Sequence, residues 1–322
     1  MISVLVPVFN GEAYVERCVV GVLGQLGAGD EVVAVDDGST DHSLERLQAI
    51  AARDSRLRVI ATEHRGAASA RGTAWAQARG EWVWMVDVDD FITEGAMTTI
   101  KQTIEANPEA QIICFNHFVV NRSGRHQVTL YAQNETITAG VDLAGRLNRH
   151  FVWDKVFRHN ALEASDFPDG ISNTEDFYLA VRSLARSTRV VCITDALYVH
   201  DTTSTSSTLR NRTPRHLIEN RNHTLAIHAL LKADIDAMSD EHARKVLREV
   251  LDRNVLAQLY AALYNHTPHV VNRTIKRYRA LGLYPVGRTT NRRANLFRLL
   301  ANQRWLFLAK MRFMLWKNRR HK

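Results

Sequence analysis

The stretch that decides the fold is the opening run ISVLVPVFNG, residues 2–11. Its first half, Ile2–Val6, is short, apolar and rich in β-branched side chains, and it stops at a proline. A second run of the same kind, Glu31–Val35, stops at Asp36 and Asp37. Short apolar runs of this type are typical of parallel strands that are buried on both faces. The sequence therefore predicts two buried strands near the start of the chain.

Helical and strand-like segments alternate along the first part of the chain. Ser39, Thr40 and Asp41 are candidates for the N-cap of a helix that runs to about Arg53. The other expected elements are, in order, helix Ala13–Leu26 before it, and strand Arg58–Ala61, helix Ala67–Ala78 and strand Trp82–Val86 after it. This alternation predicts a Rossmann-like, doubly wound, mostly parallel α/β sheet, which binds ligands at the carboxyl ends of its strands. The first loop lacks the GxGxxG pattern, which argues against a dinucleotide oxidoreductase.

The composition indicates a folded chain with two differently charged parts. Of the 322 residues, 45% are hydrophobic and 24% are charged, which excludes a disordered or collagen-like chain. Residues 1–208 carry 18 Lys and Arg against 27 Asp and Glu, whereas residues 209–322 carry 24 against 7. We therefore expect an α/β domain over residues 1–208 and a basic helical domain over residues 209–322, joined near the Ser/Thr-rich run Thr202–Thr208. The amphipathic stretches Leu217–Leu231 and Glu241–Tyr264 favour helices in the second part.

Cysteine usage and the first residues favour a cytoplasmic protein. The chain has 3 cysteines, which are far apart and form no CxxC pair, so neither a disulfide framework nor a thiolate zinc site is expected. The start of the sequence has no basic, cleavable leader, and no run of 18 apolar residues occurs. We expect neither a secretory signal nor a transmembrane helix.

Acidic side chains gather where two of the predicted strands end. The run DDGSTD, residues 36–41, follows the second strand, and DVDD, residues 87–90, follows the fourth. Carboxylates crowded at one edge of a sheet repel one another, and a divalent cation with hard oxygen ligands would explain their presence. The alternative is that Asp36, Asp41 and Asp90 are turn and cap residues. Two clusters at corresponding strand ends favour a binding site.

Four segments in register resemble the family 2 glycosyltransferases with the GT-A fold. They are VLVPVFNG (4–11), VDDGSTD (35–41), GAASARG (66–72) and GEWV (80–83) leading into DVDD. The third resembles the family's Gly-x-x-x-Ala-Arg-Asn segment, with Gly72 in place of the Asn. The resemblance implies a GT-A catalytic domain of the kind found in bacterial polysaccharide and cell-envelope transferases. It also implies a nucleotide-sugar donor, with a UDP-sugar as the first expectation.

The resemblance implies roles for individual residues on the donor side. The nucleotide-sugar would be bound by Pro7, Val8, Phe9, Asp37, Arg71 and Asp87, and Asp37 would hydrogen-bond the base. Asp89 would be the main ligand of a divalent cation, Mn²⁺ or Mg²⁺, with Asp90 as a second ligand. The cation would stabilise negative charge on the leaving diphosphate.

A second group of residues would form the acceptor side. TED, residues 174–176, matches the family's Glu-Asp motif, in which the second carboxylate, here Asp176, is the catalytic base. Taken alone, such a pair is explained by the preference of acidic residues for helix starts. The preceding WDKVF, residues 153–157, resembles an element of bacterial polysaccharide transferases and supports the catalytic interpretation. Trp153, Lys155 and Glu175 would then lie near the acceptor, although Trp153 also suits a core.

His200 is a further candidate ligand of the metal. The run YVH, residues 198–200, resembles the family's Tyr-x-Tyr segment, but a histidine stands where an aromatic ring is commoner. Imidazole is a frequent metal ligand. The alternative is that His200 has no part in the site, as most histidines of a chain have none.

The basic C-terminal segment suggests membrane association. After Asp252 no acidic residue occurs, while 16 Lys or Arg follow. Five apolar residues would share one helical face: Leu296, Leu300, Phe307, Met311 and Met314. A basic amphipathic helix can lie on an anionic leaflet, so we expect peripheral association with the inner face of the cell membrane, which suits a lipid-linked acceptor. The alternative is that this face packs on the catalytic domain or on a second subunit.

Two rival functions remain from the sequence. A nucleic-acid-binding protein would use the basic region on phosphates but leaves the strand-end carboxylates unexplained. A catalytically inactive GT-A-like scaffold would have lost a site residue, whereas Asp37, Asp89 and Asp176 are all present. The expected partners are therefore a nucleotide-sugar and a glycan or lipid-linked acceptor, and no nucleic acid.

Overall fold

The computed structural model describes residues 1–203, 213–265, 267–290, 292–304 and 306–310. The chain divides into two compact units, Met1–His216 and Leu217–Lys322. The domain boundary expected between residues 208 and 209 lies outside the described residues.

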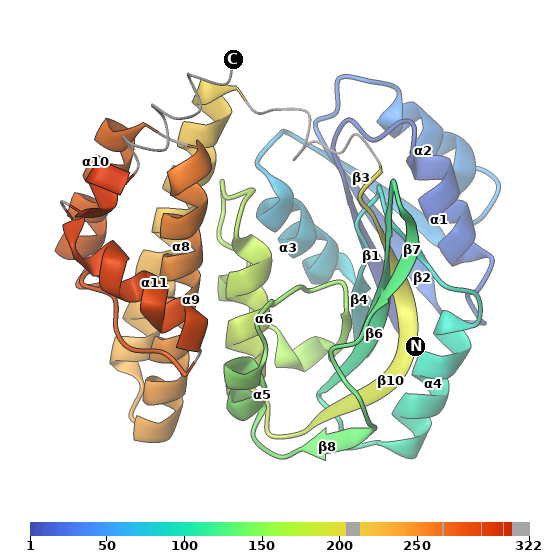
Figure 1. The fold of residues 1–322 in the computed structure, drawn as a ribbon. Helices are drawn as coiled ribbons and strands as arrows, with labels where there is room; N and C mark the ends of the chain where they lie inside the picture. Colours follow the sequence, from blue (N-terminus) through green and yellow to red (C-terminus); the bar gives the residue numbers. More distant parts are fainter. Residues whose placement is uncertain (204–212, 266, 291, 305, 311–322) are drawn as a thin grey trace. The chain divides into compact units, whose positions relative to one another are not determined.

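Among the described residues, the first unit is built on one mixed sheet of ten strands (Figure 1). The strand order is β3-β2-β1-β4-β9-β6-β10-β5, with β7 paired to β6 and β8 paired to β10. The strands are β1 Ile2–Val8, β2 Glu31–Asp37, β3 Leu57–Thr62, β4 Trp82–Met85, β5 Phe91–Ile92, β6 Ile112–Asn121, β7 Gly124–Val128, β8 Glu135–Ile137, β9 Lys155–Arg158 and β10 Val190–Asp201. Strands β3, β2, β1 and β4 are parallel, which confirms the predicted doubly wound part. Strand β9 runs antiparallel between β4 and β6.

Helices cover both faces of this sheet. In Figure 1, α1 Val15–Leu23, α2 Ser43–Ala51 and α4 Ala96–Ala106 lie on one face, and α3 Ala67–Gln77, α5 Gly140–Arg146 and α6 Glu175–Arg186 lie on the other. Every second side chain of β1, starting at Ile2, is buried in one core with side chains of α1. Since α3 packs against β1 and β2 from the other side, both faces of these strands are buried. This explains the near-continuous apolar runs of the sequence.

The start of α2 differs from the prediction. The helix begins at Ser43, and the cap position is His42, whose side chain makes no capping bond. Asp41 instead accepts hydrogen bonds from the backbone N–H groups of Glu12, at 3.1 Å, and Ser43, at 3.0 Å. This carboxylate therefore ties the loop after β1 to the loop after β2, which fixes the edge of the sheet where the acidic clusters lie.

The second unit is helical, as expected. Its helices are α8 Pro214–Ala237, which begins just before the boundary of the unit, α9 Glu241–Asn265, α10 Pro268–Ala280 and α11 Arg292–Asn302. Its core includes Leu231, Leu251 and Ile275, one from each of the first three helices. Among the described helices, none has both the length and the apolar character that a membrane span requires.

The predicted apolar face of the C-terminal segment is split. Helix α11 ends at Asn302, and Phe307 is buried, with its ring centroid 5.9 Å from that of Phe297. Leu296, which was expected on the same face, is 74% exposed. The remainder of that predicted face, Met311 and Met314, lies outside the described residues.

Candidate active site

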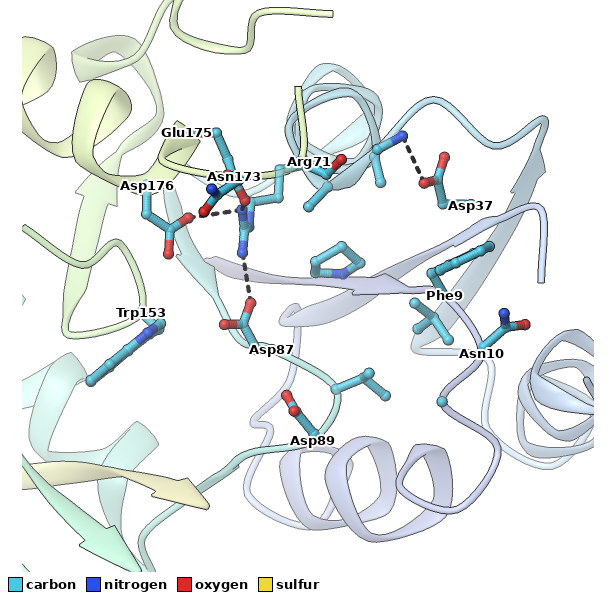
Figure 2. Close-up of a pocket in the computed structure, with 18 of the residues that line it drawn as sticks. Phe9, Asn10, Asp37, Arg71, Asp87, Asp89, Trp153, Asn173, Glu175 and Asp176 are labelled. Atoms are coloured by element: carbon cyan, nitrogen blue, oxygen red, sulfur yellow. Dashed lines mark hydrogen bonds and ion pairs between the residues drawn. The ribbon is translucent and has the colours of Figure 1, made fainter. Parts of the chain in front are cut away.

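A cavity of about 470 Å³ opens at the carboxyl ends of β1, β2 and β4 (Figure 2). This is the edge at which doubly wound sheets bind ligands, and the volume is in the range of small-molecule sites. The cavity is lined by most of the residues expected from the sequence: Pro7, Val8, Phe9, Asp37, Arg71, Asp87, Asp89, Trp153, Glu175, Asp176 and His200. Of the residues predicted for the site, Asp90 and Lys155 do not line it.

Phe9 and Asp37 lie together at one end of the cavity (Figure 2). The carboxylate of Asp37 accepts hydrogen bonds from the backbone N–H groups of Arg65, at 2.8 Å, and Gly66, at 2.9 Å. Nδ1 of His64 lies 2.8 Å from Oδ2 of Asp37. The His64 ring stacks on Phe9 with ring centroids 4.0 Å apart. His64 lines the cavity but stands in no motif, so the sequence did not predict it.

Gly66 permits this arrangement. Its φ is +95°, a backbone conformation that favours glycine. A Cβ atom at this position would lie 3.1 Å from Oγ of Ser172 and 3.2 Å from the carbonyl oxygen of Ile171. The chain can therefore pass close under the Ile171–Ser172 segment while its N–H group faces Asp37.

Arg71 connects carboxylates from two distant segments. Nη2 donates to Oδ1 of Asp87 at 2.8 Å, and Nη1 donates to Oε1 of Glu175 at 2.9 Å and lies 2.8 Å from Oδ1 of Asp176. The side chain is only 5% exposed. Burial by itself lowers the pKa of Arg71, but the charges of Asp176, Asp87 and Glu175 raise it well above its usual value. Arg71 therefore stays charged and holds the end of β4 beside the start of α6.

Asp176 lies in the first turn of α6, at the end of the cavity opposite Phe9 (Figure 2). Thr174 precedes the helix with φ of +71°, which is unusual for a β-branched residue. Burial raises the pKa of Asp176 to about 8, with the charges of Glu175 and Asp87 adding to the effect and that of Arg71 opposing it. A carboxyl group with this pKa can take up a proton near neutral pH, which is what a general base requires.

Asp89 has the environment that suits a cation ligand. Burial, together with the neighbouring charges of Asp87 and Asp90, raises its pKa to about 7. Nη2 of Arg17 donates to the backbone oxygen of Asp89 at 2.6 Å, which fixes the loop. In the described ranges no three His, Cys, Asp or Glu side chains form a metal-binding group. A cation at Asp89 would therefore take further oxygen ligands from a substrate, and phosphates commonly supply these to Mg²⁺. The residues present fit such a cation.

Asp90 is directed into the protein. It is 1% exposed, and its oxygens are 2.8 Å from the hydroxyl of Tyr198, 3.1 Å from Nδ1 of His200 and 2.8 Å from the backbone nitrogen of Asp201. The Tyr198 hydroxyl also accepts a bond from the backbone N–H of Asp87 at 3.1 Å. The structure therefore does not bring Asp90 to the cavity as a metal ligand, and its geometry favours the alternative of a structural residue. His200 lines the cavity with Nδ1 turned to Asp90.

The two predicted acceptor residues of the WDKVF run differ in position. Lys155 is fully buried, and its Nζ donates to the carbonyl oxygen of Phe151 at 2.7 Å and pairs with Asp154. The structure therefore places Lys155 in the core at the start of β9, and its side chain does not line the cavity. Trp153 is on the cavity wall, where its ring stacks on Tyr198 with centroids 4.6 Å apart.

The replacement of the family's usual Asn by Gly72 has a local explanation. A Cβ atom at residue 72 would lie 2.8 Å from Cβ of Phe167. The Phe167 ring also stacks on Trp75, one turn further along α3, with centroids 5.5 Å apart. Phe167 therefore occupies the space that a side chain at residue 72 would need.

Comparisons with known proteins identify the family. Residues 3–159 match the family model described as Glycosyl transferase family 2. The chain is 25% identical over 209 residues to the uncharacterized glycosyltransferase EpsJ of Bacillus subtilis, an alignment that covers 62% of this chain and 60% of EpsJ. It is 36% identical over 124 residues to the glycosyltransferase GlyG of Streptococcus pneumoniae, covering 38% of this chain and 41% of GlyG. The chain thus spans less than two thirds of the length of these two curated relatives.

The fold agrees with that of a solved structure. S. aureus TarS residues 1–349, determined in complex with UDP-GlcNAc, matches with a TM-score of 0.75 and 20% identity over 100% of this chain and 92% of that chain. The predicted GT-A architecture with a helical C-terminal region is confirmed. Residues 3–159 belong to the family 2 glycosyltransferases, and the chain carries a glycosyltransferase domain of this family.

Proposed function

We propose that the chain is an inverting glycosyltransferase that moves a sugar from a nucleotide-sugar to a hydroxyl of a cell-surface glycan or a lipid-linked acceptor. The observation that carries the proposal is the order of side chains along one cavity (Figure 2). Phe9 and Asp37 lie at one end, Asp87 and Asp89 lie between, and Asp176 lies at the other end. This order parallels the base, diphosphate and sugar of a nucleotide-sugar.

The base end of the cavity suits a nucleobase. The Phe9 ring offers an aromatic surface, and stacking of a base on such a ring is worth about 1–3 kcal/mol. The Asp37 carboxylate is held in place by Arg65, Gly66 and His64, so the lone pairs of its oxygens that remain unused point in a fixed direction. An N–H group of the base would donate to it. Because TarS has been solved with UDP-GlcNAc, a UDP-sugar is the first donor to test.

Asp89 would hold a divalent cation, Mn²⁺ or Mg²⁺, together with oxygens of the donor diphosphate. The cation would supply Lewis-acid stabilisation of the charge that forms on the departing phosphate. Arg71 holds the carboxylate of Asp87 at 2.8 Å, in the same loop as Asp89.

Asp176 would act as the general base. The acceptor hydroxyl oxygen forms a bond to the anomeric carbon, the bond from that carbon to the diphosphate oxygen breaks, and the hydroxyl proton moves to the Asp176 carboxylate. Attack from the side opposite the diphosphate inverts the anomeric centre. Trp153 and Glu175 line the same end of the cavity and would contact the acceptor or the transferred sugar.

The test is donor binding and transfer by the full chain across a panel of UDP-sugars with and without Mn²⁺. The Asp176→Asn variant should bind donor like the parent and lose about 10²–10⁴-fold in transfer rate. The Asp89→Asn variant should lose the Mn²⁺-dependent part of both. Asp169→Asn is the matched control, because this exposed carboxylate lies outside the cavity. Transfer by Asp176→Asn at the parent rate would overturn the base assignment, and the absence of binding heat with every UDP-sugar of the panel would overturn the UDP-sugar donor.

We also propose that residues 209–322 attach the chain to the anionic inner face of the cell membrane. Leu296 and Leu299 are exposed apolar residues of α11, in a region that has no acidic residue after Asp252. Their joint replacement by Gln should reduce flotation of the full chain with anionic vesicles. Unchanged flotation would refute attachment through α11, and a concentration-dependent dimer that the same replacements dissociate would assign this surface to a second subunit.

A further inference from the structure

Three arginines of the helical unit lie close together. Arg221 is on α8, and Arg273 and Arg277 are on α10. Residues four apart share one face of a helix, so the two arginines of α10 are neighbours. Nη1 of Arg277 donates to Oδ1 of Asn222 at 2.8 Å, which brings this face of α10 against α8 next to Arg221.

The contacts of these arginines leave their positive charges uncompensated. Nη2 of Arg273 contacts Nε2 of His269 at 3.1 Å, and Arg277 donates to the amide of Asn222, so both partners are uncharged groups when the imidazole is neutral. Nη1 of Arg221 is buried and has no hydrogen-bond partner among the described residues. The ion pairs of the described part of this unit belong to other side chains, such as Lys232 with Asp236.

The electrostatics of Arg221 agree with this arrangement. Burial lowers the pKa of Arg221, and the positive charges of Arg277 and Arg273 lower it further. Like charges held together in a partly buried setting raise the free energy of the folded state. A bound anion would remove that cost, and three guanidinium groups offer more donors than one carboxylate can accept.

We propose that Arg221, Arg273 and Arg277 form a binding site for a phosphate group. The planar guanidinium donates two parallel hydrogen bonds to phosphate oxygens, and arginine clusters are suited to this anion. Arg273 and Arg277 are exposed, so a phosphate can reach them from solvent, and Arg221 beside them is half-buried. None of the three lines the cavity of the first unit, so the site does not depend on the proposed transfer reaction. The phosphate belongs either to a soluble molecule or to the headgroup of an anionic lipid.

The first test is calorimetric titration of the full chain with pyrophosphate in the absence of divalent cations. Loss of one charge-assisted hydrogen-bond donor costs about 1.5–3 kcal/mol, so Arg273→Gln should weaken binding about tenfold or more. Lys276→Gln is the matched control, because it removes the same charge from an exposed position of the same helix. Equal affinity of these two variants for pyrophosphate, together with equal vesicle binding, would overturn the proposal.

A second readout separates a binding role from a structural one. In low-salt buffer without phosphate, Arg273→Gln should raise the midpoint of thermal unfolding, because it removes repulsion, whereas an arginine that stabilises the fold would lower it. Co-sedimentation with phosphatidylcholine vesicles, with and without phosphatidylglycerol, identifies the source of the phosphate. Weaker sedimentation of Arg273→Gln than of Lys276→Gln on the anionic vesicles supports a lipid headgroup. Equal sedimentation with unequal pyrophosphate affinity supports a soluble phosphate.

Discussion

Replacement of Arg71 by Met tests how much the buried guanidinium group of Arg71 contributes to the free energy of unfolding of the first unit. Its guanidinium contacts the carboxylates of Asp87, Glu175 and Asp176 at 2.8–2.9 Å and is almost fully buried. Met keeps much of the aliphatic stem but removes the charge, so the three carboxylates then face one another. Removing one partner of a buried ion pair costs about 3–5 kcal/mol, and we expect a loss of this size in the free energy of unfolding of the first unit.

The assay is thermal unfolding followed by calorimetry or circular dichroism. For a unit that spans Met1–His216, a loss of 1 kcal/mol lowers the midpoint by about 2–4 °C, so Arg71→Met should lower it by about 6–20 °C. Arg65→Met is the control, because Arg65 is an exposed arginine next to the cavity whose partner, Asp169, is also exposed. This control should unfold at the same temperature as the parent.

The difference between Arg71→Met and the parent should depend on pH. Burial already raises the pKa of Asp176 to about 8 against the opposing charge of Arg71, so removal of Arg71 raises it further. A carboxyl group whose pKa is raised in the folded state favours folding below its unfolded pKa of about 4, and this contribution is lost as pH rises through the folded pKa. Between about pH 5 and pH 7 Asp176 is protonated in both folded proteins, so the gap in midpoint should stay constant there. The gap should widen as pH rises from about 7 to 9, because only the parent's Asp176 then loses its proton in the folded state. Equal midpoints of Arg71→Met and the parent near pH 7, or a gap that is the same at about pH 7 and about pH 9, would refute the reasoning.

Three further predictions concern the proposed donor and base. Phe9→Ala should weaken UDP-sugar binding by about 1–3 kcal/mol in calorimetry, while Phe9→Tyr should bind like the parent, and equal affinity of the two variants would argue against base stacking. The transfer rate should rise with pH and level off above about 8, because Asp176 must lose its proton to act as a base, and a rate that falls over this range would contradict that role. Gly66→Ala should destabilise the protein by about 1–3 kcal/mol in denaturant unfolding, because φ of Gly66 is +95°. It should also weaken donor binding, because the N–H group of residue 66 holds Asp37. Gly29→Ala introduces the same kind of backbone strain away from the cavity and should leave donor binding unchanged.

The strands and helices of the first part were predictable because each leaves a local pattern. Strands β1 and β2 begin at the predicted residues, Ile2 and Glu31, since their side chains are buried on both faces. Strand β9 left no such pattern, because its place between β4 and β6 depends on pairings with segments 40 or more residues away. The start of α2 was misplaced because Asp41 bonds to the neighbouring loop as well as to Ser43.

The prediction of which side chains line the cavity agrees with the structure where a motif and its place on the sheet coincide, as for Asp37, Asp89 and Asp176, and their roles stay predictions. It was incomplete where the direction of a side chain depends on distant partners. Asp90 is turned inward by Tyr198 and by other groups of β10, and neither interaction is visible in the spacing of the DVDD run. The role of His64 depends on its stacking against Phe9, which follows only from the way the two loops meet.

The hydroxyl of Tyr198 has a consequence for the order in which the cavity is completed. It contacts both the backbone of Asp87 and the carboxylate of Asp90, although Tyr198 follows these residues by 111 and 108 positions in the chain. During synthesis, β1 and β2 with their loops are available long before this tyrosine leaves the ribosome. We therefore expect the end of the cavity that holds Phe9 and Asp37 to form early, and the loop that carries Asp89 to become rigid only when β10 has paired. Under the proposed function, a nascent chain that ends before β10 would bind a nucleoside but would transfer no sugar from a nucleotide-sugar.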